Sequence, residues 1–279
     1  MTNLNLFLKP MLKWAGGKRQ LLSEIMPLIN GRDSYSSYIE PFLGGGAAFF
    51  CLQPDKAVIN DCNTELMNVY LTVKNNIDEL IEELKFHKSM DSDKYFYKIR
   101  AWDREENFSQ ISNVKRAARI IYLNKTCYNG LYRVNSYGEF NSAYGKYKNP
   151  NIVNEGLLRA VSDYLNSGDI KIITDDYKEA LKLADKNSFV YLDPPDLPVT
   201  SSLIKYTKYG FDYNNHIELK KECDKLSERG IHFLQSNSDC EKIRELYKDY
   251  KIKEVMAKRC INCKGEKRGK IKELLIYNY

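Results

Sequence analysis

The residues with the clearest chemical potential are Asp193-Pro194-Pro195-Asp196, which follow a short run at residues 188–192 that is apolar from Phe189 onward. That run predicts a buried strand. Because two prolines cannot continue a sheet ladder, the chain must leave the sheet directly after Asp193. The Asp193 carboxylate and the Pro194 carbonyl then lie at the carboxyl edge of the sheet, where open α/β folds bind ligands. Two such acceptors can hold both N–H bonds of an amino group and free its lone pair for attack.

A second set of residues predicts a nucleoside-type ligand. Gly44-Gly45-Gly46 stands between a predicted strand and a predicted helix, so its backbone amides are available at a helix N-terminus. Asp61 ends the next strand, where a carboxylate commonly receives ribose hydroxyls, although a helix N-cap is an alternative role. Asp176-Tyr177 follows a later strand and can bind and stack on an adenine ring, or form a simple turn.

The segment Lys13-Trp14-Ala15-Gly16-Gly17-Lys18 supplies an aromatic face, two glycines and two cations. The cations can neutralise a carboxylate or a phosphate. Gly-Gly-Lys also occurs in many ordinary turns. The segment is not a phosphate-binding P-loop, because the upstream glycine and the trailing Ser or Thr are missing.

Alternating strand and helix signals indicate an α/β fold that positions these motifs. We expect helices at 20–29 and 47–52, and strands at 38–40, 57–60, 170–173, 189–192, 231–235 and 273–277. From residue 64 to about 122 the strand signals give way to helical spacing, including a helix at 114–123, and residues 124–150 are polar, glycine-rich and aromatic. The simplest division is an α/β domain of residues 1–64 and 166–279, split by a mostly helical insert at 65–165.

The overall composition is that of a soluble globular protein, with 43% apolar and 29% charged residues. No apolar run approaches the ~20 residues of a membrane span, and we expect a cytoplasmic protein. A net charge of +6 and the pairing of 43 Lys and Arg with 21 Tyr suit nucleic-acid binding, although a biased genome explains the Tyr count equally well. Cys260 and Cys263 have zinc-ligand spacing, but a second ligand pair is not evident, so we expect no metal site.

Together the motifs and their order resemble the Dam-type DNA adenine methyltransferases, most closely those of the DpnM kind. In that family a glycine loop comes first, a target-recognition insert second and the catalytic motif last. The matching segments cover nearly the whole chain and include residues 13–18, 40–50, 60–63, 116–119, 128–135, 138–150, 193–195, 236–238 and 268–270. The resemblance implies a Rossmann-like domain that uses S-adenosylmethionine, with a mostly helical target-recognition insert.

The resemblance also implies a substrate and a set of site residues. The substrate is a flipped adenine in double-stranded DNA, commonly in the sequence GATC. The cofactor would be held by Trp14, Lys18, Phe42, Gly44, Gly45, Gly46, Asp61, Asp176, Tyr177 and Asp193. The catalytic positions would be Asp193, Pro194 and Asp196. The DNA contacts would be Tyr128, Asn129, Leu131, Arg133, Asn135 and Lys146. We further expect a monomer, with any cognate restriction endonuclease acting separately.

The base-reading segment has residue types that suit its implied role. Arg133 can bind a guanine edge through two bonds, and Leu131 can pack on a thymine methyl. Tyr128 can wedge into the base stack as the adenine leaves it. On the helix at 114–123, the cations Lys115, Arg116 and Arg119 would contact phosphate, or simply form a solvated face.

The chain departs from the family pattern at Asp196, where the family has Tyr or Phe. That aromatic ring stacks on the flipped adenine, and stacking contributes ~1–3 kcal/mol per base. Asp196 has no such face, and its negative charge tends to raise the pKa of Asp193. We therefore predict strongly reduced or absent methylation, with Tyr206, Tyr209 or Phe211 as partial substitutes for the stacking face. The alternative is a catalytically silent protein that binds DNA and S-adenosylmethionine.

Two further departures are smaller. Residues 142–146 read Ser-Ala-Tyr-Gly-Lys where relatives have Val-Pro-Phe-Gly-Arg, and Lys146 cannot make the two parallel bonds of an arginine. The GATC assignment is weakened accordingly. Asp175 replaces a usual glycine before Asp176. Similar Pro-Pro motifs also serve methyltransferases of RNA or protein glutamine, but the segment 128–133 argues against those substrates.

Overall fold

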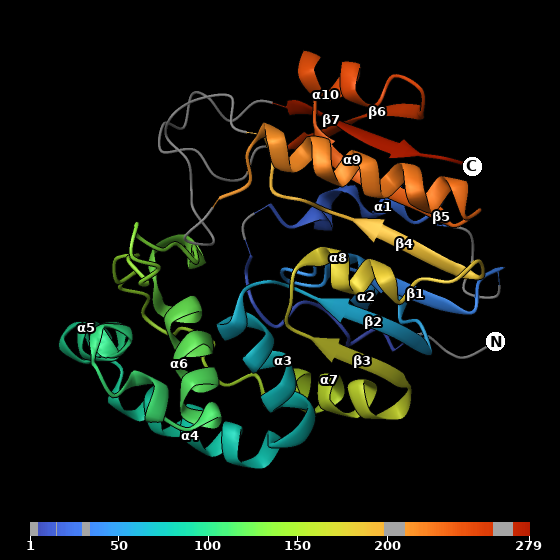
Figure 1. Cartoon of the computed structure of the whole chain (residues 1–279). Coiled ribbons are helices and arrows are strands. Elements are labelled where there is room, and N and C mark those ends of the chain that lie inside the picture. The colour runs from blue at the N-terminus through green and yellow to red at the C-terminus, as the bar shows by residue number, and fades with distance from the viewer. Residues whose placement is uncertain (1–4, 15, 30–33, 198–209, 259–269) are drawn as a thin grey trace. The chain divides into compact units, whose positions relative to one another are not determined.

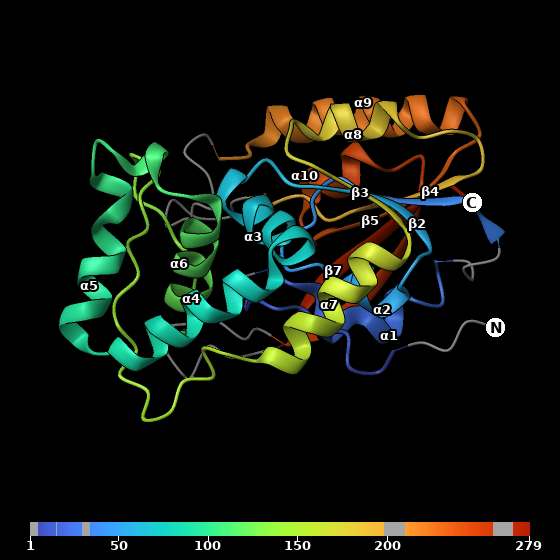
Figure 2. The ribbon, with the colours of Figure 1, turned by 90° about the horizontal axis from the view of Figure 1, so that it is seen from below.

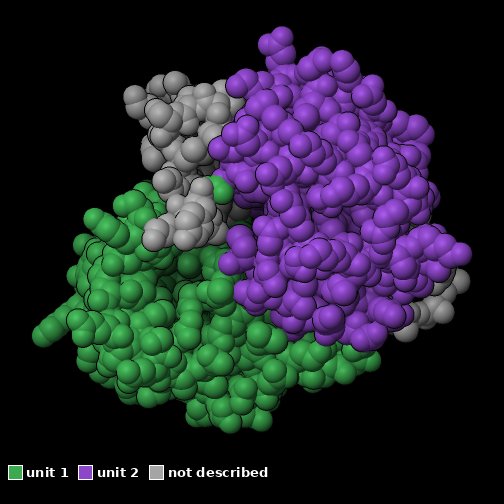
Figure 3. Space-filling model, in the orientation of Figure 1, with its two compact units in different colours: residues 1–15, 63–168, 202–210 green, residues 16–62, 169–201, 211–279 purple. Residues whose placement is uncertain are grey.

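The computed structural model describes residues 5–14, 16–29, 34–197, 210–258 and 270–279 (Figure 1). The chain divides into two compact units, which Figure 3 colours separately. Unit 1 is formed by residues 1–15, 63–168 and 202–210. Unit 2 is formed by residues 16–62, 169–201 and 211–279.

Unit 2 is built on a seven-stranded sheet with the order β3-β2-β1-β4-β5-β7-β6. The first five strands in this order run parallel, and β7 is antiparallel to both of its neighbours. The strand order reverses between β1 and β4, which is the point where open α/β sheets bind ligands. The strands are β1 Ser37–Glu40, β2 Lys56–Asn60, β3 Asp169–Ile173, β4 Ser188–Leu192, β5 His232–Ser238, β6 Lys251–Lys258 and β7 Lys270–Tyr277.

Helices lie on both faces of this sheet (Figure 2). One face carries η1 (Lys18–Leu21), α1 (Leu22–Ile25) and α2 (Ala47–Leu52), and the other carries α8 (Tyr177–Lys182), α9 (Tyr213–Glu228) and α10 (Glu241–Leu246). Every residue of β4 is buried, as expected for a central parallel strand covered on both sides. The predicted α/β fold is confirmed.

Two predicted elements of unit 2 need correction. The helix expected at 20–29 is a 3-10 turn followed by one short α-helix that ends at Ile25. Pro27 explains the early end, because it has no N–H to bond the carbonyl of Ser23 and its ring clashes with that carbonyl. The edge strand β6 was not predicted: within its residues 251–257, Val255 and Ala257 are buried and the others are not, so its apolar signal is weak.

Unit 1 is mostly helical, as the spacing after residue 64 predicts. Side chains that accept a backbone N–H cap the starts of four helices: Asn63, Ser92, Ser112 and Asn154. Helix α6 packs against α3, α4 and α5 and is buried along most of its length. The helices are α3 Thr64–Asn75, α4 Ile77–Met90, α5 Asp93–Ala101, α6 Asn113–Thr126 and α7 Glu155–Ser167, with short 3-10 turns η3 Trp102–Arg104, η4 Phe108–Gln110 and η5 Tyr128–Gly130.

A buried histidine makes the stability of unit 1 dependent on pH. His87 stacks on the Tyr122 ring at 5.1 Å, its Nδ1 lies 2.7 Å from the Tyr95 hydroxyl, and burial lowers its pKa to about 4. The pKa of a histidine in the unfolded chain is ~6.5. The contribution of neutral His87 to the unfolding free energy is therefore complete above that pH and is lost as the pH falls toward 4. Lowering the pH from 7 to 5 reduces the unfolding free energy of the parent through protonation of His87. We predict that this reduction is about 2 kcal/mol smaller in His87→Gln.

Urea unfolding at the two pH values measures this difference. His232→Gln is the matched control, because His232 is exposed. It is expected to keep the pH dependence of the parent. Identical pH dependence in His87→Gln and the parent would show that His87 is not the group responsible.

Candidate active site

Asp193 lies directly after β4 with one carboxylate oxygen firmly held. Its Oδ1 is 2.9 Å from Nζ of Lys18 and accepts a 2.7 Å hydrogen bond from Oγ of Ser236 on β5. Within the described residues, Oδ2 of Asp193 accepts no hydrogen bond, and the side chain is 19% exposed. The carboxylate is therefore fixed from the protein side and keeps one acceptor oxygen at the edge of the sheet.

Lys18 is a buried cation shared between two carboxylates. Its Nζ lies 3.7 Å from Oε2 of Glu273 on β7 and donates to the Gly16 carbonyl at 3.1 Å. Burial alone would lower the pKa of Lys18, but the surrounding carboxylates, Asp193 first, raise it well above the usual range. Lys18 thus stays charged and compensates the negative charge around Asp193.

The ionisation of Asp193 reflects opposing effects. Burial raises the pKa of Asp193, whereas Lys18 and Ser236 oppose that rise by stabilising the ionised form. The exposed Asp196 also raises the pKa of Asp193, as predicted, but its effect is smaller than that of burial. Nearby on β1, Glu40 is buried and accepts a 2.8 Å hydrogen bond from Tyr38, and burial raises its pKa well above the usual range.

Asn60, which the sequence analysis left without a role, ties three strand ends together. Its side-chain nitrogen donates to the carbonyls of Pro41 at 2.9 Å and Asp175 at 3.1 Å, and its Oδ1 accepts from the Asp175 N–H at 2.9 Å. These residues follow β1 and β3, the two strands that flank β2. Asn60 therefore fixes the loops that carry Gly44 and Asp176.

The glycine loop and Asp61 come together as predicted from their positions. The Gly44 N–H donates to Oδ2 of Asp61 at 2.9 Å. Gly44 and Gly46 have φ values of 49° and 70°, a left-handed conformation that favours glycine. The alternative role of Asp61 as a helix N-cap is wrong, because Asn63 caps α3.

The pair Asp176-Tyr177 stands at the start of α8. Asp176 is the N-cap of α8 and accepts from the Lys178 N–H at 2.9 Å. Tyr177 is buried, with its ring stacked on Phe42 at 5.1 Å and edge-on to Phe211 at 6.4 Å. This packing leaves little of the Tyr177 ring exposed for stacking on an adenine. Half-buried Phe42 lies over the ring instead.

The predicted DNA contacts of unit 1 lie on a short hairpin and its flanks. An antiparallel bridge joins Val134 to Phe140, and Arg133 donates to the Asn141 side chain at 2.7 Å and to its carbonyl at 3.2 Å. Tyr128 is 63% exposed, and Lys146 is also exposed. Asn129 donates its N–H to the Tyr147 hydroxyl, Leu131 is half-buried, and the Asn135 side chain accepts the N–H groups of Tyr137 and Glu139.

Comparison with known proteins gives the family. Residues 14–261 match the model of the D12 class N6 adenine-specific DNA methyltransferases. The chain belongs to this family. It is 44% identical over 274 residues to the type II methyltransferase M1.LlaDCHI of Lactococcus lactis subsp. cremoris, covering 98% of this chain and 96% of the relative. It is 47% identical over 289 residues to the type II methyltransferase M.MjaIII of Methanocaldococcus jannaschii, covering 97% and 99%.

A third relative is the DNA adenine methylase of Haemophilus influenzae, 34% identical over 276 residues, with coverage of 96% of this chain and 92% of the relative. The predicted family is therefore confirmed. The seven-stranded sheet with helices on both faces is that of the methyltransferase fold to which the D12 family belongs.

The hairpin closed by the Val134–Phe140 bridge is held by residues that the sequence patterns did not predict. Asp103 accepts the Phe140 N–H at 2.7 Å, and Arg104 donates to the Phe140 carbonyl at 2.8 Å. Tyr144, in the altered stretch 142–146, donates to Asp91 at 3.2 Å, and Tyr122 donates to the same carboxylate at 2.8 Å. The extra hydroxyl of Tyr144 therefore has a defined partner in this chain.

Arg119 corrects another prediction, because it neither contacts phosphate nor forms a solvated face. It is 1% exposed, donates to the carbonyls of Ile99 and Arg100 at 2.9 Å and pairs with Asp103 at 2.7 Å. Arg116 pairs with Glu65. Lys115 remains exposed and available for phosphate.

Trp14 and Lys18 belong to different units. Trp14 is in unit 1, where its ring stacks on Tyr132 at 4.7 Å, whereas Lys18 is in unit 2 beside Asp193. Tyr206 and Tyr209, two of the substitute stacking faces, lie outside the described residues, as do Cys260 and Cys263.

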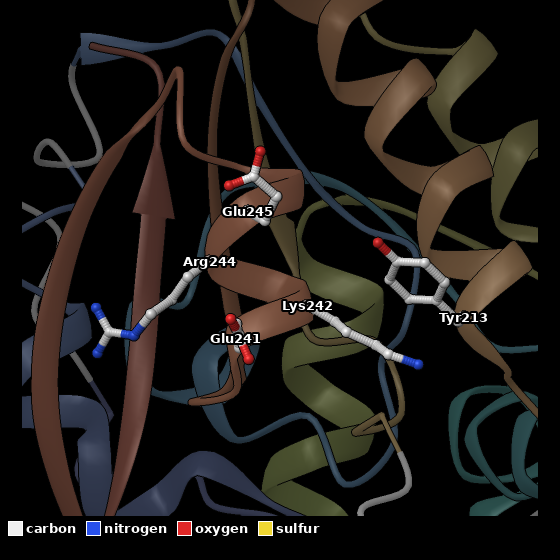
Figure 4. Close-up of a pocket in the computed structure, with 5 residues that line it drawn as sticks. All are labelled: Tyr213, Glu241, Lys242, Arg244 and Glu245. Atoms are coloured by element: carbon white, nitrogen blue, oxygen red, sulfur yellow. The ribbon is translucent and has the colours of Figure 1, made fainter.

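A separate surface pocket contains none of the predicted site residues (Figure 4). It is lined by Tyr213, Glu241, Lys242, Arg244 and Glu245. Arg244 is already paired with Asp239 and Glu254 at 2.6 Å, and Nζ of Lys242 lies 5.1 Å from the centre of the Tyr213 ring.

In the part of the chain that the structure describes, no helix is long and apolar enough to cross a membrane.

Proposed function

We propose that the chain is a site-specific DNA methyltransferase that transfers a methyl group from S-adenosylmethionine to the 6-amino group of a flipped adenine in GATC duplex DNA. The observation that supports this most is Asp193 after β4, with Oδ1 held by Lys18 and Ser236 and with Oδ2 accepting no hydrogen bond from any described residue. Pro194 follows it and supplies a second acceptor, its carbonyl.

These two acceptors give the amino group the geometry that transfer needs. The lone pair of an adenine 6-amino nitrogen is delocalised into the ring, so the nitrogen is a poor nucleophile. Oδ2 of Asp193 and the Pro194 carbonyl can each accept a hydrogen bond from one N–H of this amino group. The nitrogen then moves toward tetrahedral geometry and its lone pair is freed. The mechanism needs no covalent enzyme intermediate.

The residues along β1 and β2 suit S-adenosylmethionine, which supplies an electrophilic sulfonium methyl group when bound. Gly44, Gly45 and Gly46 provide a close backbone approach, and the left-handed φ of Gly46 precedes the start of α2. Asp61, positioned by the Gly44 N–H, is the acceptor for the ribose hydroxyls. Lys18, Phe42 and Asp176 of unit 2 and Trp14 of unit 1 complete the proposed set by position in the family.

We propose that Asp196 makes transfer by this chain slow. It is exposed, carries no ring and adds negative charge near Asp193. Phe211 is a poor substitute, because its ring already packs on Phe42 at 5.9 Å and on His216 at 4.8 Å. This observation favours the second candidate function, a catalytically silent member of the family that keeps DNA and S-adenosylmethionine binding.

For the target, we propose that Tyr128, Arg133 and Lys146 contact the duplex, with Asn129, Leu131 and Asn135 supporting them. Tyr128, Arg133 and Lys146 are exposed on one hairpin segment, and this exposure supports the proposal. The naming of two relatives as type II methyltransferases supports a restriction–modification setting, with a separate nuclease. We also propose that the chain acts as a cytoplasmic monomer.

Arg133 gives a test of target reading that does not depend on turnover. We predict that Arg133→Lys reduces the preference for a GATC duplex over one with a changed guanine by roughly tenfold, because a bidentate guanine contact contributes ~1–3 kcal/mol of discrimination. Competition binding measures it. Lys115→Ala is the control, expected to weaken both duplexes equally. A preference that Arg133→Lys leaves intact would remove Arg133 from guanine reading.

The function itself is tested in cells that lack other adenine methylation. Plasmid DNA from cells expressing the chain, or its Asp196→Tyr variant, is digested with a nuclease that GATC adenine methylation blocks. We expect strong protection with Asp196→Tyr and weak or no protection with the parent. Full cleavage with both chains, while both are folded and bind S-adenosylmethionine, would contradict the proposed reaction or its GATC target.

A further inference from the structure

Ser236 is a fully buried serine on β5 whose hydroxyl reaches the reacting carboxylate. Its Oγ lies 2.7 Å from Oδ1 of Asp193 and 3.1 Å from the Tyr191 hydroxyl, whereas the Leu192 carbonyl is farther, at 3.4 Å. Tyr191, on β4, is also buried. The pairing of β4 with β5 brings the three side chains together at adjacent strand ends.

The chemistry of these groups fixes the direction of the hydrogen bonds. An ionised carboxylate only accepts, so Ser236 must use its single proton for the short bond to Asp193. The serine oxygen can then only accept from Tyr191, whose phenol has one proton to donate. The result is a one-way chain of donors from Tyr191 to Ser236 to Oδ1 of Asp193.

Lys18 approaches the same Oδ1 of Asp193, but its role differs from that of the Tyr191–Ser236 hydrogen-bond series. Its ammonium group is also bonded to the Gly16 carbonyl and lies near Glu273. Among the described residues, the other carbonyl within reach of the Ser236 hydroxyl is that of Leu192, at 3.4 Å, so the short bond to Asp193 takes the Ser236 proton. The two donors together occupy Oδ1 and fix the rotation of the carboxylate.

We propose that Ser236, oriented by Tyr191, is a positioning residue that holds Oδ1 of Asp193 so that Oδ2 accepts the amino group of the substrate. The inference deepens the proposed function and rests on it for the identity of the substrate. It assigns a role to Ser236 and Tyr191, which lie outside the catalytic motif itself.

Because Ser236 stabilises the ionised carboxylate, its removal must change the titration of Asp193. The charged and titratable groups that face Asp193 are Lys18, Glu40, Tyr191, Asp196 and Glu273. Ser236→Ala leaves all of them in place and deletes one donor to the ionised form. The pKa of Asp193, already raised by burial, is therefore expected to rise further.

Carbon-13 NMR of aspartate-labelled protein measures this pKa, with the Asp193 carboxyl signal assigned by its loss in Asp193→Asn. Ser238→Ala is the matched control. Ser238 is two residues along β5 on the same face, and its hydroxyl makes no hydrogen bond within the described residues. We expect an upward shift of the Asp193 midpoint in Ser236→Ala, a smaller one in Tyr191→Phe and none in Ser238→Ala. An unshifted midpoint in folded Ser236→Ala overturns the proposal.

Turnover in the Asp196→Tyr background adds a kinetic readout. Ser236→Ala is expected to lower kcat about tenfold below neutral pH, with KM for the duplex unchanged and with the acid limb of the pH–rate profile moved to higher pH. A loss of rate equal at every pH would mean a structural role and would also overturn the proposal. If no variant methylates DNA, the proposed function fails, whereas the NMR titration still decides the role of Ser236.

Discussion

Replacing Asp196 by tyrosine is expected to raise the rate of methyl transfer to adenine at least about fivefold. The ring would give the flipped base a stacking face, which is worth ~1–3 kcal/mol per base, or roughly 5-fold to 150-fold in rate if it acts in the transition state. The substitution also removes a negative charge that opposes ionisation of Asp193. Single-turnover transfer of labelled methyl to a GATC duplex measures the effect.

Asp196→Asn separates the two causes. It removes the charge and adds no aromatic ring, so we expect a rate between the parent and Asp196→Tyr, closer to the parent. If Asp196→Asn matches Asp196→Tyr, charge rather than stacking limits the parent. If the parent methylates as fast as Asp196→Tyr, our interpretation of Asp196 is wrong.

Replacing Lys18 by methionine is expected to lower the unfolding free energy by about 3–5 kcal/mol, because it leaves buried carboxylates without their cation. Asp193 and Glu273 are only 19% and 13% exposed and both lie within 4 Å of the Lys18 nitrogen, at 2.9 and 3.7 Å. Urea unfolding at neutral pH measures the loss.

Two further variants make this prediction specific. Lys253→Met removes an exposed ion pair with Glu24 and is expected to cost less than about 1 kcal/mol. Adding Asp193→Asn to Lys18→Met removes one of the stranded charges and should recover part of the lost stability. Equal losses in Lys18→Met and Lys253→Met, or no recovery in the double variant, would show that the buried charges are not coupled.

The parts of the fold that the sequence predicts are those with strong local signals. Residues 189–192 of β4 are continuously apolar because both faces of the strand are covered. The helices of unit 1 have helical spacing, and four of those described, α3, α5, α6 and α7, begin at capping side chains. The edge strand β6 escaped prediction, since lysines and glutamate interrupt its apolar residues. The early end of α1 was predictable in principle from Pro27, which the periodicity alone does not register.

In the candidate site, too, residues with strong local signals were predicted and the others were not. Asp193, Gly44 and Asp61 stand at strand ends and are found from local sequence. Asn60, Ser236 and Glu273 act through neighbouring strands, and no local pattern shows which strands are neighbours. Arg119 was misjudged for a related reason, because charged helix residues are usually exposed and its partners come from residues 99–103 in another helix and the turn after it.

The central claim is that Asp193 and Pro194 present an adenine 6-amino group for methylation. Its most direct test is mass spectrometry of the nucleosides from a GATC duplex treated with S-adenosylmethionine and the Asp196→Tyr chain, beside the same chain carrying Asp193→Ala. We predict N6-methyldeoxyadenosine with the first chain and none with the second. A methylated cytosine, or equal N6-methyldeoxyadenosine from the chain that lacks Asp193, would contradict the claim.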